Sequence, residues 1–184
     1  MRWPLADHNR LILKHLRLGD GVQRAAATSI ARTGILRVLN PYAPLIVGTL
    51  PIDVHLPDSD VDVICHVKAP KAFMALLVQR FGDQPSFTLG RTTLQRKPAV
   101  VCSFRHRRTL FEIVGMPVAT HTQRAYVHLM VEAALLQETG AHAAIRRLKR
   151  LGLKTEPAFA RHFKLAGDPY QAVARLWRRK SVSG

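Results

Sequence analysis

Apolar residues recur with a period near 3.6 in two segments at the start of the chain, and this spacing predicts two amphipathic helices. The first covers residues 5–18 and ends at Gly19-Asp20-Gly21. The second covers residues 22–39, with Gly34 weakening its middle, and ends at Asn40-Pro41. We expect the apolar sides of both helices to face inward.

The centre of the chain is rich in predicted strands. A short apolar run over residues 44–47 leads into Gly48, and apolar and polar residues alternate over residues 60–67. A helix is predicted next, over residues 71–81. Three more strands are predicted, with short gaps that suit hairpins, over residues 86–94, 99–105 and 109–114.

The last third of the chain has a helical pattern throughout. Residues 120–139 are apolar almost all round, as in a buried helix. Further helices are predicted over residues 141–151, 156–163 and 169–179, with Thr155 and Asp168 placed to cap two of them. This order predicts an α+β fold with a core over residues 1–116 and a helical C-terminal region, residues 117–184, packed on it.

Charge adds information about partners. The 28 Lys and Arg against 12 Asp and Glu give a net charge of +16, which attracts polyanions such as nucleic acid and nucleotides. A biased genome composition would also produce an Arg-rich chain. Residues 141–184 carry +9, because two acids oppose eleven basic residues: Arg146, Arg147, Lys149, Arg150, Lys154, Arg161, Lys164, Arg175, Arg178, Arg179 and Lys180.

Acidic residues, by contrast, gather in one short segment. Asp53, Asp58, Asp60 and Asp62 fall within ten residues. Like charges repel unless a cation or basic groups lie among them, so the cluster indicates a metal site. We interpret Asp53 and Asp58 as solvated loop acids that take no part in it.

Asp60 and Asp62 stand two apart on a predicted strand, so both carboxylates should point to the same face. Glu112 lies inside the apolar strand Leu110–Val114, where a carboxylate needs a partner such as a shared metal ion. Gly48 allows close approach of the backbone to a phosphate, and Thr49 offers a hydroxyl and an N–H group.

Together these motifs resemble the polymerase-beta-like nucleotidyltransferase superfamily. Its pattern is a glycine followed by serine or glycine, then Asp-x-Asp, then a third acid on a later strand, and the resemblance covers about residues 22–115. Thr49 is a mild departure that keeps the hydroxyl. More narrowly, the stretches GTLPI, SDVDVIC, FEIVG, QRAYVHLMVEA, GLKTEPAFA and GDPYQAV resemble a small bacterial family of uncharacterised proteins with this core.

The resemblance implies a mixed β-sheet flanked by helices and a two-metal mechanism that uses Mg²⁺ or Mn²⁺. Asp60, Asp62 and Glu112 would be the catalytic and metal-binding residues, and Glu112 would help to deprotonate the acceptor hydroxyl. A nucleotidyl group would pass from a nucleoside triphosphate such as ATP to that hydroxyl. The candidate nucleotide-binding residues are Gly48, Thr49, Ser59, Arg91, Arg124 and His128.

Each of the outlying candidates has a plainer interpretation. Arg91 lies on a middle strand, where exposed charges also protect a sheet edge. His128 shares a helical face with Arg124, but it also suits a core histidine paired with Glu132. Lys154 and Thr155 suit a helix cap better than a phosphate site.

The favoured acceptor is RNA, for example tRNA, held by the basic C-terminal helices; a protein side chain or a small hydroxyl compound is the alternative. A catalytically inactive module that binds nucleic acid or a protein partner is the rival function. The N-terminal residues lack the apolar region of a secretory signal, and we expect a cytoplasmic protein without membrane spans. Cys65 and Cys102 lie in apolar runs and are expected to be reduced core residues.

Overall fold

A computed structural model describes residues 4–182, and the side chains up to residue 176. The mixed α+β fold predicted from the sequence is confirmed. Five strands form one sheet in the order β1-β2-β5-β4-β3. Their bounds are β1 Leu45–Val47, β2 Val61–His66, β3 Thr88–Leu94, β4 Lys97–His106 and β5 Thr109–Met116. Only β2 and β5 run parallel among these neighbours, and the other pairs are antiparallel.

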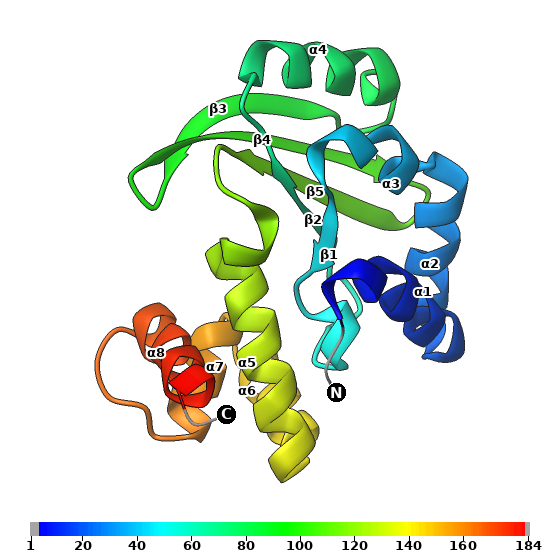
Figure 1. Ribbon diagram of the computed structural model, residues 1–184. Coiled ribbons are helices and arrows are strands. Elements are labelled where there is room, and N and C mark those ends of the chain that lie inside the picture. The colour runs from blue at the N-terminus through cyan, green and yellow to red at the C-terminus, as the bar shows by residue number, and fades with distance from the viewer. Residues whose placement is uncertain (1–3, 183–184) are drawn as a thin grey trace.

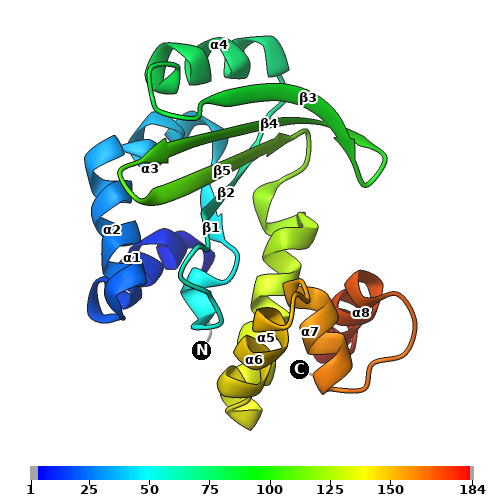
Figure 2. The same ribbon diagram turned by 180° about the vertical axis from the view of Figure 1, so that it is seen from behind.

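The helices lie in three groups around this sheet (Figures 1 and 2). The first group comes before β1 and consists of α1 His8–Leu18, α2 Gly21–Thr33 and α3 Ile35–Val38. Next, α4 Pro70–Phe81 covers one face of the sheet. The third group follows the sheet and consists of α5 Arg124–Thr139, α6 His142–Arg150, α7 Thr155–His162 and α8 Pro169–Val182. No helix in the described range 4–182 is long and apolar enough to cross a membrane.

Two details of the predicted helices were wrong. The helix expected over residues 22–39 is broken, because Gly34 adopts a left-handed conformation (φ 61°) that ends α2. Thr155 is the first residue of α7, not its cap, and the cap position holds Lys154 without a capping hydrogen bond from its side chain. The Asp168 cap is confirmed, since its Oδ1 accepts from the Gln171 N–H at 2.9 Å.

Side chains alternate between the two faces of β2 and β5, and this alternation separates the core from the site. Phe111 stacks on Phe104, which stacks in turn on Phe81 of α4, so this face forms the aromatic core. Asp62 and Glu112 stand on the opposite face, which looks toward the C-terminal helices. The strands thus bury a hydrophobic layer on one side and present acids on the other.

The parallel pairing of β2 and β5 sets the position of the acids. Asp62 pairs with Glu112, and three residues further along the two strands Cys65 pairs with Gly115.

Cys65 and Cys102 are buried free thiols, as predicted, and burial raises the pKa of Cys102 to about 12. A side chain at Gly115 would meet Phe73 of α4 at 2.6 Å and Val67 at 2.7 Å.

The close packing at Gly115 yields a stability prediction. Gly115→Ala should destabilise the protein by about 1–3 kcal/mol, because the core against α4 has no room for a methyl group. Gly90→Ala is the matched control on the edge strand β3, where a Cβ meets nothing within 4 Å, and it should change stability by less than about 0.5 kcal/mol. Urea denaturation of both variants tests the pair, and equal stabilities would contradict the packing of α4 on β5.

Candidate active site

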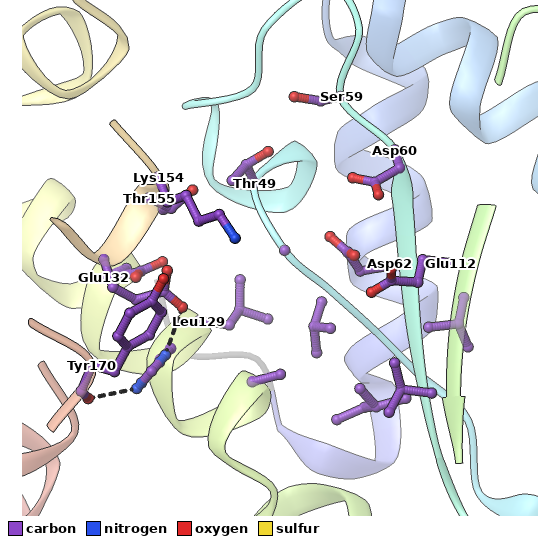
Figure 3. Close-up of a pocket in the computed structure, with 18 of the residues that line it drawn as sticks. Thr49, Ser59, Asp60, Asp62, Glu112, Leu129, Glu132, Lys154, Thr155 and Tyr170 are labelled. Atoms are coloured by element: carbon purple, nitrogen blue, oxygen red, sulfur yellow. Dashed lines mark hydrogen bonds and ion pairs between the residues drawn. The ribbon is translucent and has the colours of Figure 1, made fainter. Parts of the chain in front are cut away.

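Three carboxylates from neighbouring strands point into one cavity of about 510 Å³ between the sheet and the C-terminal helices (Figure 3). Asp60 precedes β2, Asp62 lies within β2, and Glu112 lies beside Asp62 on β5. The strand register places Asp62 beside Glu112, and Asp60 lies two residues before Asp62, just outside β2. We call Asp60, Asp62 and Glu112 the acidic triad.

The triad carries unfavourable electrostatics in the absence of a cation. Burial, and then repulsion from Asp60 and Glu112, raise the pKa of Asp62 well above its ordinary value of 3.8. Burial and repulsion from Asp60 also raise the pKa of Glu112, and Lys154 offsets part of this effect. Oxygen donors that repel one another in this way suit a hard divalent cation.

Gly48 forms the turn next to the triad and is required there for two reasons. Its φ of 80° lies in the left-handed region, and a Cβ at this position would stand 1.9 Å from Oδ2 of Asp62. β1 pairs with β2 so that Val47 lies opposite Asp62, which brings the turn directly to the carboxylate. Thr49 and Ser59 line the same cavity.

The C-terminal helices form the opposite wall of the cavity, which holds both basic and acidic side chains. Lys149 and Lys154 line the cavity beside Glu132 and Glu156. Burial lowers the pKa of Lys149, although Glu132 and Asp62 attract its charge, and its Nζ donates to the Val54 carbonyl at 2.8 Å. Ile64, Val114, Ala125 and Leu129 give the cavity an apolar part.

A family model described as a domain of unknown function (DUF4269) matches residues 28–176. The chain belongs to the DUF4269 family. No curated protein matches it. The bacterial origin of the family, which the sequence motifs suggested, stays a prediction.

Solved structures similar to this DUF4269 protein are nucleotidyltransferases. Cid1, described as having RNA terminal uridylyl transferase activity, has a TM-score of 0.53 at 9% identity, over 79% of this chain and 47% of that one. Cid1 poly(U) polymerase with Mg 3'-dATP bound scores 0.53 at 11%, over 92% and 54%. The polymerase core of TRAMP, an RNA surveillance complex, scores 0.51 at 11%, over 92% and 51%. The similarity establishes a nucleotidyltransferase-type fold, and this chain spans about half the length of these neighbours.

Four of the six predicted nucleotide-binding residues lie at the cavity of the acidic triad, and two do not. Gly48, Thr49, Ser59 and His128 line the triad cavity. The structure does not bring Arg91 or Arg124 into this cavity. Arg91 is exposed on β3 and lines a hollow near Pro70, and Arg124 lines another hollow formed with α8.

Two interpretations of single residues were wrong. Asp53 is not a solvated loop acid, because His15 lies 2.8 Å from its Oδ1 and Gln23 donates to the same oxygen at 2.6 Å. Burial favours the neutral form of Asp53, but these hydrogen bonds outweigh it and lower its pKa. His128 pairs with Glu156 of α7 and not with Glu132, its neighbour along α5.

Several residues of the helical wall were not predicted to belong to the site. Sequence spacing gave no reason to bring Lys149, Glu156 or Tyr170 to the triad, since they come from three different helices. Lys154 was assigned a capping role, yet it points into the cavity (Figure 3). A weak signal existed in Glu132, a carboxylate with apolar neighbours on both sides in α5.

The raised pKa of Asp62 predicts how stability depends on pH in the metal-free protein. Because the folded state holds this proton more tightly than the unfolded state, stability is greatest below about pH 4 for this group and falls as pH rises through the raised value. Asp62→Asn should remove that loss and leave the fold intact or slightly stabilised. Each kcal/mol gained would raise Tm by about 2–4 °C.

Thermal melts from pH 5 to 8 in EDTA measure this effect as the difference in Tm between Asp62→Asn and the parent. Asp58→Asn, at an exposed loop position, is the control for the loss of one charge. Mg²⁺ should shrink the difference by stabilising the parent. An Asp62→Asn protein that unfolds would show that the acid is needed for the fold itself.

Proposed function

We propose that this protein is a Mg²⁺-dependent nucleotidyltransferase that transfers a nucleoside monophosphate from a nucleoside triphosphate to an acceptor hydroxyl. The observation that carries the proposal is the register of Asp62 with Glu112, beside Asp60 and against the Gly48 turn. A protein that merely binds nucleic acid through its basic surface has no need of three mutually repelling acids in a cavity.

The acidic triad would hold the metal. The fit rests on the raised pKa values of Asp62 and Glu112, which record an unbalanced negative charge, and on donors that are all oxygens. Divalent ions bound there would neutralise the phosphates and stabilise charge that develops during transfer. Mg²⁺ and Mn²⁺ both accept such ligands.

The nucleotide would lie across the cavity. The backbone of the Gly48 turn and the hydroxyls of Thr49 and Ser59 can donate to phosphate oxygens on the sheet side. Lys149 and Lys154 supply positive charge from the helical wall. The apolar part of the cavity and the ring of Tyr170 suit the flat face of a nucleobase.

In the transfer step the acceptor oxygen attacks the α-phosphorus. A bond forms between these two atoms, the bond from phosphorus to the bridging oxygen breaks, and pyrophosphate leaves with that oxygen. The carboxylate of Glu112, which points into the cavity, would take the proton of the acceptor hydroxyl. The cavity walls hold the reacting atoms in line, which supplies much of the rate enhancement.

RNA, for example tRNA, is the acceptor that the charge distribution favours. Arg147 and Arg150 are exposed on α6, the helix that also delivers Lys149 to the cavity. Arg146 belongs less to this surface, since its Nη1 donates to the Asp53 carbonyl at 2.7 Å. The side chains of Arg178, Arg179 and Lys180 lie outside the described residues. The cavity would lie between a core of residues 1–116 and a helical region of residues 117–184.

A transfer assay tests the proposal. The protein would be incubated with each labelled nucleoside triphosphate, Mg²⁺, and either total cellular RNA or a pool of small hydroxyl compounds. We expect label in one acceptor fraction, and a kcat for Asp62→Asn lower by about a thousandfold or more, since loss of a metal ligand removes several kcal/mol of charge stabilisation. Asp58→Asn should retain activity, and transfer that survives Asp62→Asn would sink the proposal.

The RNA acceptor predicts a specific salt dependence. Each phosphate contact with single-stranded RNA contributes about −0.7 to the slope of log K against log salt, so Arg147→Gln with Arg150→Gln should flatten the slope by about 1.4 units. Lys71→Gln with Arg80→Gln, exposed on α4 at the opposite end of the molecule from α6 (Figure 1), makes the same change in net charge and should not flatten the slope. Equal slopes for the two double variants would show that the arginines of α6 do not contact RNA. Nucleotide binding should be unaffected in either variant.

A further inference from the structure

A second group of potential metal ligands lies on the helical wall of the cavity, apart from the acidic triad. His128 and Glu132 stand four residues apart on α5 and therefore share a face of that helix. Glu156 comes from the first turn of α7. One ligand atom of each residue lies within 4.8 Å of the others, and all three residues line the cavity.

The hydrogen bonds of His128 indicate where a metal ion could replace a proton. Nε2 lies 2.9 Å from the carbonyl oxygen of Tyr170, which can only accept, so Nε2 carries a hydrogen (Figure 3). In the neutral ring Nδ1 then carries a lone pair. Nδ1 lies 2.8 Å from Oε1 of Glu156, which is also an acceptor when ionised. At this separation the two atoms share a proton, and a metal ion could take the place of that proton after a small outward shift of the side chains.

Glu132 distinguishes between the two possibilities. Its side chain is buried, with 4% exposure, and its Oε1 has no hydrogen-bond partner among the described residues. A proton between His128 and Glu156 leaves that oxygen unpaired, which is costly in a buried site. A metal ion reached by all three side chains satisfies every one of these atoms.

We propose that His128 Nδ1 and the carboxylates of Glu132 and Glu156 bind one divalent transition-metal ion, for which Zn²⁺ is the probe. An imidazole nitrogen with two carboxylates is a donor set that Zn²⁺ accepts, with a fourth position open. The bond from Nε2 to the Tyr170 carbonyl is the outer contact that orients such a histidine. Two carboxylates also balance the two charges of the ion.

This ion differs in place and in kind from the Mg²⁺ of the acidic triad. The triad offers oxygen alone, whereas this site includes nitrogen, so the two should select different metals. Because all three residues line the cavity, an ion held by them would be accessible to an oxygen of a molecule bound there. The assignment does not depend on the proposed transfer activity.

Calorimetric titration of untagged, EDTA-treated protein with ZnCl₂, in excess Mg²⁺ to occupy the triad, tests the site. We expect one Zn²⁺ per chain for the parent. Glu132→Gln, which preserves shape, should weaken binding by more than about 100-fold, since losing even an outer contact costs about 10–100-fold. His128→Asn should do the same. His162→Asn, at an exposed position on α7, is the control and should bind as the parent does.

Asp62→Asn separates this site from the triad. It should bind Zn²⁺ as the parent does while losing Mg²⁺-dependent nucleotide binding. Should His128→Asn fail to fold, Glu132→Gln still decides, provided that its Tm in EDTA equals that of the parent. Unchanged Zn²⁺ binding by Glu132→Gln, no binding by the parent, or loss of binding in Asp62→Asn alone would each overturn the proposal.

Discussion

The pairing of two parallel strands creates the constraint on which the site depends. β2 and β5 place Asp62 beside Glu112, and the core of Phe104 and Phe111 on the other face prevents either strand from shifting by one residue. A slip of either strand would move the acid of that strand into the hydrophobic layer. The fold therefore holds like charges together at a cost that a bound cation would relieve.

The cavity joins two walls with different chemistry. The sheet side carries acids and a glycine turn, and the helical side carries Lys149 and Lys154 with a second acidic group and a histidine. Charge on the helical side is balanced locally, so that a protein of net charge +16 has a cavity with five carboxylates. A polyanionic nucleotide would enter such a cavity only together with cations, and the Mg²⁺ proposed at the acidic triad would meet this requirement.

The sheet side of the site could be predicted from the sequence, and the helical side could not. Asp60, Asp62 and Gly48 lie close in the chain and Glu112 lies on a strand, so period-two geometry was enough to bring them together. Lys149, Glu156 and Tyr170 reach the cavity only through the packing of four helices, which local patterns do not encode. Asp53 was misjudged for the same reason, because its partners His15 and Gln23 lie about 30 or more residues away in the chain.

The central claim is that the acidic triad binds divalent metal ions, and anomalous diffraction tests it most directly. Crystals grown with Mn²⁺ and a non-hydrolysable nucleoside triphosphate analogue should show anomalous density bounded by Asp60, Asp62 and Glu112, with the phosphates against the Gly48 turn. Crystals of Asp62→Asn should lose that density. Mn²⁺ bound elsewhere in the parent, with the triad free of metal while the analogue is present, would contradict the account.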